Sequence, residues 1–198
     1  MDKPLLILVL AAGLSRRMGR PKQLLPIGGE TLLRYVVKKA LTVPHASVAV
    51  VGSGESLMKQ QCEDLPVVWI ENRDAHDGMS TSIKAGISYA QDCSAGSVMI
   101  LLGDQPGMDP GVLAGMAGAF GAGSSGMLQA RYEGKPGHPV MFDRRFFPEL
   151  LKLEGDTGAK PLLQRHADSL QFWDVNTPVP VDLDTPEEYE HYIRSSEE

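Results

Sequence analysis

A short glycine-bearing segment near the start of the chain gathers four basic residues. These are Arg16, Arg17, Arg20 and Lys22. Guanidinium forks and a compact ammonium bind phosphate oxygens, and Gly13 and Gly19 let backbone N–H groups face an anion. The segment directly follows the apolar run 5–10, and ligands of open α/β sheets lie beyond the carboxyl ends of strands. It therefore predicts a triphosphate-binding loop rather than a solvated turn, although it is not a Walker sequence.

An acidic residue follows another apolar run. Asp104 stands in Gly103-Asp-Gln-Pro106, directly after the run 98–102. A leaving pyrophosphate needs a cation to neutralise its charge, and magnesium takes oxygen ligands that include one or two protein carboxylates. Asp104 is therefore a candidate Mg²⁺ ligand. The alternative is that it only begins the turn before Pro106.

The elements that must position these residues follow from the apolar periodicity. Continuous apolar runs at 5–10, 47–51, 67–70 and 98–102 predict strands that are covered on both faces. Helical patterns at 31–41, 53–62 and 80–90 lie between them. This strand–helix alternation predicts an α/β fold with a mainly parallel sheet.

The second half of the chain is less regular. We expect strands at 127–132, 138–142 and 170–175, and helices at 144–153, 159–165 and 186–193. Gly121–Gly126 satisfies GxGxxG, but it follows a helix and precedes a strand, which is the reverse of the dinucleotide-binding order. Because no repeat or linker interrupts the pattern, residues 1–198 are interpreted as a single domain.

Composition narrows the class of protein. A net charge of −6 over 198 residues argues against a nucleic-acid binder. Cys62 and Cys93 stand far apart, which disfavours a disulfide framework or a zinc site. No apolar stretch is long enough for a signal peptide or a membrane span, so we expect a cytoplasmic chain.

The segment 10–26 resembles a known signature. Leu-Ala-Ala-Gly-x-Ser-Arg-Arg-Met-Gly-x-Pro-Lys-Gln-Leu-Leu-Pro is similar to the motif of the MobA-like nucleotidyltransferases, most closely the molybdenum cofactor cytidylyltransferase (MocA-type) branch. The guanylyltransferase branch more often has glycine at the place of Ala12 and aspartate at that of Pro21, which favours CTP over GTP. The resemblance covers nearly the whole chain. It implies a three-layer α/β/α Rossmann-like fold of the nucleotide-diphospho-sugar transferase (GT-A-like) type, with a mainly parallel mixed sheet.

The resemblance also implies a nucleotide site. Arg17, Lys22 and Asp104 would be catalytic, and Gly78, Ser80 and Ser82 come from a Gly-Met-Ser-x-Ser-Ile segment at a helix start, where an ordinary cap is the alternative role for either serine. The full nucleotide-binding set is Leu10, Ala11, Ala12, Gly13, Arg16, Arg17, Lys22, Gly78, Ser80, Ser82 and Asp104.

The family motif Val181-Asp-Leu-Asp-Thr-Pro-Glu187 supplies a second metal carboxylate. Asp182 aligns with the position that completes the Mg²⁺ site with Asp104. Asp184, which precedes Thr185-Pro186, is assigned mainly to capping the last helix. On the acceptor side the resemblance implies His138, Asp156 and Lys160. A structural hydrogen bond is the alternative for His138, and relatives often have arginine at the position of Lys160.

The implied reaction is transfer of CMP from CTP to the terminal phosphate of molybdopterin or molybdenum cofactor, with release of pyrophosphate. The expected partners are CTP or another NTP, a phosphorylated pterin and a molybdenum hydroxylase or its maturation factor, with neither nucleic acid nor membrane. One alternative is a nucleotidyltransferase that uses GTP or a sugar phosphate. An alternative of another class is a non-catalytic molybdenum cofactor carrier or delivery protein.

Overall fold

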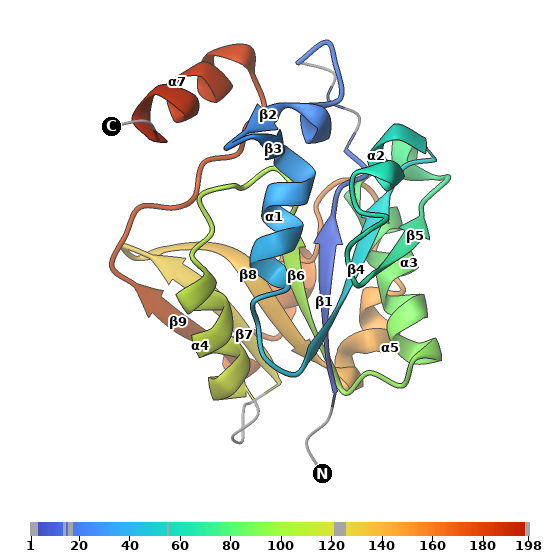
Figure 1. Ribbon diagram of the computed structural model, residues 1–198. Coiled ribbons are helices and arrows are strands. Elements are labelled where there is room, and N and C mark those ends of the chain that lie inside the picture. The colour runs from blue at the N-terminus through green and yellow to red at the C-terminus, as the bar shows by residue number, and fades with distance from the viewer. Residues whose placement is uncertain (1–3, 14, 16–17, 55, 121–125, 197–198) are drawn as a thin grey trace.

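The computed structural model describes residues 4–13, 15, 18–54, 56–120 and 126–196. Within them, the main sheet runs in the order β5-β4-β1-β6-β8-β7-β9, and a small ribbon pairs β2 with β3 (Figure 1). The strands are β1 (Leu5–Leu10), β2 (Pro26–Ile27), β3 (Glu30–Thr31), β4 (Ala46–Gly52), β5 (Val67–Glu71), β6 (Ser97–Leu102), β7 (Met127–Tyr132), β8 (Lys135–Asp143) and β9 (Leu170–Val175).

The central strands are parallel and in register. β1 pairs with β4 on one side and with β6 on the other, so Leu10 lies opposite both Val51 and Leu102. β8 is antiparallel to β6 and to β7, whereas β9 is parallel to β7. The predicted mainly parallel mixed sheet is therefore confirmed. The register brings the residues after β1 and after β6 to the same edge of the sheet.

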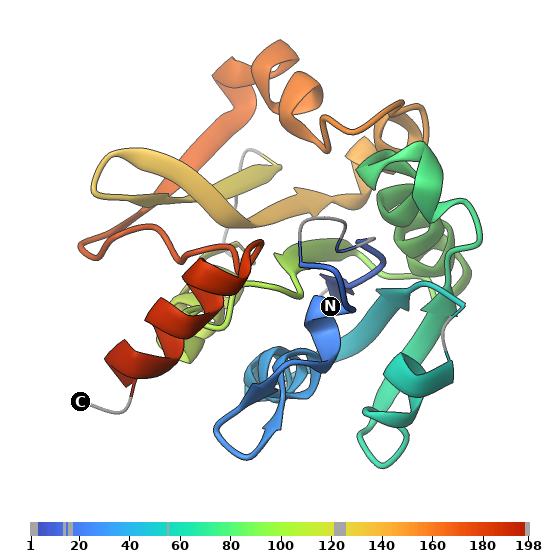
Figure 2. The ribbon, with the colours of Figure 1, turned by 90° about the horizontal axis from the view of Figure 1, so that it is seen from above.

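Helices cover both faces of this sheet, as Figures 1 and 2 show. Side chains of α1 and α4 pack into one buried cluster, and those of α3, α5 and α6 into the other. The three-layer α/β/α arrangement is thus confirmed. The helices are α1 (Leu32–Ala40), α2 (Ser56–Gln60), α3 (Met79–Asp92), α4 (Pro110–Phe120), α5 (Phe147–Leu150), α6 (Lys160–Arg165) and α7 (Pro186–Ser196).

Two predicted helices are shorter than their apolar patterns. The helix expected at 144–153 is divided into a 3-10 turn at Arg144–Phe146 and the single turn of α5, which has a proline at its start. The helix expected at 53–62 is reduced to α2. Among the described residues, no helix is long and apolar enough to cross a membrane.

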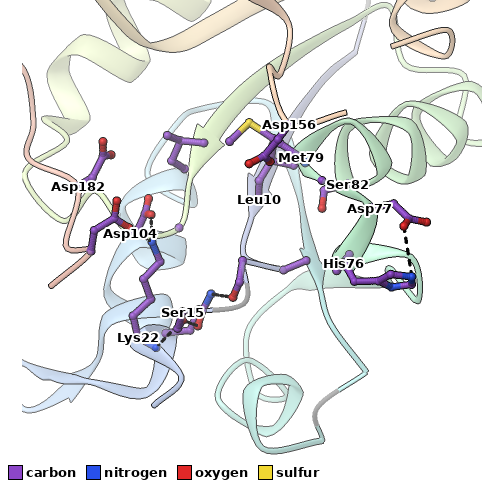
Figure 3. Close-up of a pocket in the computed structure, with 18 of the residues that line it drawn as sticks. Leu10, Ser15, Lys22, His76, Asp77, Met79, Ser82, Asp104, Asp156 and Asp182 are labelled. Atoms are coloured by element: carbon purple, nitrogen blue, oxygen red, sulfur yellow. Dashed lines mark hydrogen bonds and ion pairs between the residues drawn. The ribbon is translucent and has the colours of Figure 1, made fainter. Parts of the chain in front are cut away.

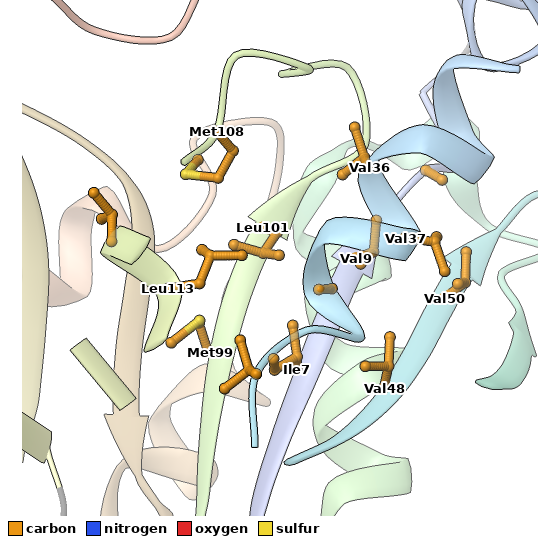
Figure 4. Close-up of a cluster of buried hydrophobic side chains, with 14 of the residues drawn as sticks. Ile7, Val9, Val36, Val37, Val48, Val50, Met99, Leu101, Met108 and Leu113 are labelled. Atoms are coloured by element: carbon orange, nitrogen blue, oxygen red, sulfur yellow. The ribbon is translucent and has the colours of Figure 1, made fainter. Parts of the chain in front are cut away.

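The core explains the continuous apolar runs of β1, β4 and β6. The prediction that the run 67–70 is also covered on both faces is wrong, because β5 is an edge strand with half-buried and exposed side chains. Ile7 and Val9 of β1 point into the cluster with α1, while Leu6 and Leu8 point into the opposite cluster. The apolar stripe of α1, including Val36 and Val37, packs on β1 and β4 (Figure 4). A strand buried on both faces needs apolar residues at every position rather than alternate ones.

We expect Leu33→Ala to lower the free energy of unfolding by about 3 kcal/mol, because a fully buried leucine loses its apolar contacts and leaves a cavity. Leu33 is 0% exposed, whereas Leu57 on α2 is 58% exposed. Leu57→Ala is therefore the matched control, with an expected change under about 0.5 kcal/mol. Urea denaturation measures both. Equal losses in the two variants would contradict the packing described here.

Candidate active site

A cleft of about 680 Å³ opens at the carboxyl edge of the sheet, beyond β1 and β6 (Figure 3). Its volume falls within the range of small-molecule binding sites. Its walls come from the loop after β1, the start of α3, the loop after β6 and two later segments. The lining residues are Leu10, Ala12, Gly13, Ser15, Lys22, Gln23, Ala75, His76, Asp77, Gly78, Met79, Ser82, Leu102, Gly103, Asp104, Gly155, Asp156, Asp182 and Asp184.

Two polar side chains hold the loop after β1 together. Gln23 is buried, and its Nε2 donates to the carbonyl oxygens of Ala11 at 2.9 Å and of Gly13 at 3.1 Å. Ser15 Oγ accepts from the backbone N–H of Lys22 at 3.0 Å and donates to Gln23 Oε1 at 3.3 Å. These bonds join the two ends of the loop. Sequence reasoning missed Gln23, although an isolated glutamine before Leu24 and Leu25 was a visible signal.

We expect Gln23→Leu to cost about 1–3 kcal/mol of stability, because the carbonyls of Ala11 and Gly13 lose their donor. It should also weaken nucleotide binding, since the loop is no longer fixed. Gln61→Leu is the matched control, because Gln61 Nε2 makes one surface bond to Leu57 O at 3.2 Å. Thermal unfolding and nucleotide titration of both variants provide the measurement. A Gln23 variant indistinguishable from the Gln61 variant would disprove this role.

Two ion pairs of the described cleft share the side chain of Lys22. Its Nζ pairs with Asp104 Oδ2 and, at 2.6 Å, with Asp184 Oδ1. Burial alone lowers the pKa of Lys22, but the two carboxylates together outweigh it and raise that pKa above its ordinary value. Lys22 is therefore a fixed cation. It lies 82 positions from Asp104 and 162 positions from Asp184.

A second acidic segment runs beside Asp104. The backbone N–H of Leu183 donates to the carbonyl oxygen of Asp104 at 3.1 Å, and the Leu183 side chain is buried in the core. Asp182 and Asp184, on either side of Leu183, both line the cleft. Asp182 Oδ1 accepts from Gln105 Nε2 at 2.8 Å. Partial desolvation raises the pKa of Asp182, and this hydrogen bond opposes the rise.

The assignment of Asp184 to helix capping is wrong. Thr185 caps α7 instead, because its hydroxyl accepts from the N–H of Glu188 at 3.2 Å. Glu188 Oε2 reaches back to the N–H groups of Asp184 and Thr185, both at 2.9 Å. This reciprocal arrangement is a capping box. It leaves the carboxylate of Asp184 to pair with Lys22.

Lys39 ties α1 to the loop that follows Asp104. Its Nζ donates to the carbonyl oxygens of Pro106 at 2.6 Å and Met108 at 3.0 Å, and it lies 4.7 Å from the centre of the Tyr35 ring. Burial lowers the pKa of Lys39. The loop that carries Asp104 and Gln105 is thus anchored to a helix of the scaffold.

The opposite wall is the start of α3. Gly78 has φ +107°, and a Cβ there would lie 2.7 Å from the carbonyl carbon and oxygen of Gly155, so only glycine fits this contact. Gly155 O accepts from Ser80 N at 3.1 Å, and Asp156 Oδ1 accepts from Met79 N at 2.9 Å. The 155–156 loop therefore satisfies N–H groups at the start of α3.

The cleft brings together most of the expected nucleotide-binding residues that the structure describes. Two of them do not line the cleft: Ala11 belongs to the hydrophobic core, and the side chain of Ser80 is buried. Arg16 and Arg17 lie outside the described residues. The expected residues that do line the cleft are Leu10, Ala12, Gly13, Lys22, Gly78, Ser82 and Asp104.

The expected acceptor residues are spread more widely. Asp156 lines the cleft, whereas His138 and Lys160 do not. The ring Nδ1 of His138 lies 3.3 Å from Ile100 O, and burial lowers the pKa of His138. Lys160 is exposed at the first residue of α6. Their acceptor roles stay predictions.

The carboxylates fit a divalent cation. Asp104 Oδ1 is buried and has no hydrogen-bond partner in the described part of the chain, and an unpaired carboxylate oxygen is a preferred ligand of Mg²⁺. Asp182 offers a second carboxylate from the neighbouring segment. Among the described residues no three acidic, histidine or cysteine side chains form a ready-made metal cage. Magnesium does not require one, because it keeps waters and substrate phosphates as further ligands.

Comparison with known proteins agrees with this geometry. The model of the MobA-like NTP transferase domain matches residues 7–170. The purine catabolism protein PucB of Bacillus subtilis (strain 168) is 31% identical over 211 residues, covering 98% of this chain and 99% of that protein. The molybdenum cofactor cytidylyltransferase of Escherichia coli (strain K12) is 25% identical over 183 residues, covering 92% of each.

Solved structures show the same fold. The homologue of Mycobacterium tuberculosis Rv0371c from Mycobacterium sp. strain JC1 superposes with a TM-score of 0.84 at 31% identity, over 98% of both chains. The complex of Rv0371c with manganese, from M. tuberculosis H37Rv, gives a TM-score of 0.79 at 27% identity, over 96% of this chain and 98% of that one. Manganese is thus a metal bound by a protein to which this chain is similar.

Proposed function

The chain belongs to the MobA-like NTP transferase family and is a nucleotidyltransferase, and from this premise we propose that it transfers CMP from CTP to the terminal phosphate of molybdopterin, free or metal-bearing, with release of pyrophosphate. The observation that carries the proposal is the meeting of a glycine loop, the cation Lys22 and the carboxylate Asp104 in one cleft. These are the groups that a nucleoside triphosphate and its metal require.

The choice of CTP rests on sequence and similarity together. Ala12 and Pro21 favour the cytidylyltransferase branch, and one relative over most of the chain is a molybdenum cofactor cytidylyltransferase. The same relative supports the phosphorylated pterin as acceptor. We further propose that the product passes to a molybdenum hydroxylase or to its maturation factor.

The residues around the first loop would hold the triphosphate. Backbone N–H groups at Ala12 and Gly13 would face the β- and γ-phosphates. Lys22 would contribute its positive charge beside them, because its pKa is raised and it stays protonated. Arg16 and Arg17 would add further phosphate donors. Gly78 and Ser82, on the α3 side of the cleft, would bind the nucleoside.

The reaction needs little proton chemistry. An oxygen of the acceptor phosphate, already ionised near neutral pH, attacks the α-phosphorus of CTP. The bond from the α-phosphorus to the oxygen that bridges to the β-phosphate breaks, and pyrophosphate leaves with that electron pair. No general base is required, so positioning and charge neutralisation account for catalysis.

Asp104 and Asp182 would hold Mg²⁺, which neutralises charge on the reacting phosphates when bound. The unpaired Oδ1 of Asp104 supports this assignment, and Gln105 keeps Asp182 facing the cleft. Before nucleotide binds, the positive charge of Lys22 offsets the electrostatic repulsion between the carboxylates of Asp104 and Asp184. Asp156, which lines the cleft, would face the acceptor. His138 and Lys160, which lie outside the cleft lining, would be farther from it.

Pyrophosphate release tests the proposal. The protein is supplied with Mg²⁺, freshly prepared molybdenum cofactor and either CTP or GTP. We expect release from CTP that depends on the cofactor. Release from GTP alone would contradict the proposed nucleotide. Release from CTP only when a sugar phosphate replaces the cofactor would contradict the proposed acceptor. Cofactor binding without release would instead favour the carrier alternative.

A further inference from the structure

Asn72 follows β5 and is one of the few buried polar residues of the described chain, with 5% of its surface exposed. Its Oδ1 accepts from the backbone N–H of Asp74 at 3.1 Å. Its Nδ2 lies 2.9 Å from both Thr81 Oγ1 and Ser82 Oγ. A backbone N–H can only donate, so the Asp74 contact settles which end of the amide carries oxygen. The –NH₂ group therefore faces the two hydroxyls.

This orientation determines the polarity of both hydroxyls. Each one must accept a hydrogen from Asn72 and has one hydrogen of its own to donate. The Thr81 hydroxyl donates its hydrogen to a backbone carbonyl, either Asp74 O at 3.0 Å or Gly78 O at 2.8 Å. The Ser82 hydroxyl donates no hydrogen bond to another residue that the structure describes. Ser82 lines the cleft, so its hydroxyl is set to donate to a ligand.

The position of Ser82 indicates which part of a nucleotide it meets. In Figure 3 it lies on α3, on the same side of the cleft as His76 and Asp77 of the preceding turn and away from Lys22 and Asp104. If the phosphates lie along the loop after β1, beside Lys22, the nucleobase falls on the α3 side. A donor there requires an acceptor on the base. Cytosine offers O2 and N3, whereas its amino group would meet the Ser82 hydroxyl donor to donor.

We infer that Asn72 is a positioning residue for nucleotide recognition: it makes the Ser82 hydroxyl a hydrogen-bond donor to the carbonyl oxygen or ring nitrogen of the cytosine of CTP. This inference rests on the proposed function. Asn72 itself does not contact the nucleotide; it acts by orienting the hydroxyl hydrogen of Ser82.

Asn72→Asp tests the inference with nearly the same shape. The new carboxylate still accepts from Asp74 N–H, but it accepts from Ser82 as well and so removes the hydrogen intended for the base. With Mg²⁺ present, calorimetric titration should show the Kd for CTP rising roughly tenfold, the value of one hydrogen bond. The KM for CTP should rise in parallel, with kcat at saturating CTP within about twofold.

Ser82→Ala and the double variant separate this role from a charge effect or a folding defect. Ser82→Ala should raise the Kd for CTP by a similar factor, and adding Asn72→Asp should raise it no further. Thr81→Val is the matched control: it removes the other partner of the same amide outside the cleft lining, so the Kd should stay within about twofold. Melting temperatures verify that each variant is folded.

Two results would overturn the inference: a Ser82→Ala variant that binds CTP as tightly as the wild type, or a double variant in which the two factors multiply. Wild-type protein that binds GTP and not CTP would contradict the proposed nucleotide instead. The same variants titrated with GTP would then decide the role of Asn72, because guanine also offers acceptors on its edges.

Discussion

Asp104→Asn is expected to lower Mg²⁺-dependent release of pyrophosphate from CTP by about a thousandfold, as for loss of one electrostatic group aimed at the reacting phosphates. The amide keeps the size of the side chain but not its charge. It removes the negative charge that pairs with Lys22, and it offers a cation at most one neutral oxygen in place of a charged carboxylate. Steady-state kinetics with CTP and cofactor provide the measurement.

Asp109→Asn is the matched control for this substitution. Asp109 stands on the same loop but outside the cleft lining, and its Oδ1 accepts from Gly111 N at 2.8 Å, a bond that an asparagine oxygen can also accept. Its turnover should stay within about twofold of the wild type. If Asp104→Asn also retained near-normal turnover, the cleft would not be the catalytic site. Unimpaired delivery of cofactor by the same variant would support a carrier.

Lys22→Met is expected to reduce kcat/KM for CTP by about a hundredfold or more, because a charge-assisted contact from a buried ammonium to phosphate is lost. The substitution also leaves Asp104 and Asp184 facing each other without their shared cation. Lys22→Arg should recover only part of the loss, since a planar guanidinium does not fit the place of a compact ammonium.

Lys38→Met controls for the loss of one positive charge near the loop. Lys38 pairs with Glu30 on the surface and half of its side chain is exposed. We expect its kcat/KM to stay within about twofold of the wild type, as for most surface substitutions. A Lys22 variant that matched the Lys38 variant would show that the triphosphate lies elsewhere.

The sequence predicted the sheet and the meeting of its two central site residues. Continuous apolar runs such as Leu5–Leu10 marked strands buried on both faces, and the structure confirms this for β1, β4 and β6 but not for the edge strand β5. Because parallel strands end at one edge, the residues after β1 and after β6 were expected together. Lys22 and Asp104 do pair there, although 82 positions separate them.

The parts that could not be predicted depend on tertiary contacts. An aspartate before Thr185-Pro186 fits a helix cap as well as an ion pair, and the burial of Leu183 beside Asp104 decides between them. Gln23 stands out in the sequence as an isolated polar residue before Leu24 and Leu25, but its partners are backbone carbonyls that only the folded loop brings within reach. The polarity of Ser82 depends on Asn72, ten positions earlier in the loop after β5.

The most direct test of the central claim follows the phosphates of CTP. Labelled CTP is incubated with the wild-type protein, Mg²⁺ and molybdenum cofactor, with the label on the α-phosphate in one reaction and on the γ-phosphate in the other. We predict that the α-label appears in a cytidine dinucleotide of the pterin and the γ-label in pyrophosphate. An α-label that stays in free nucleotide while the cofactor is bound, or that is transferred only when a sugar phosphate replaces the cofactor, would contradict the account.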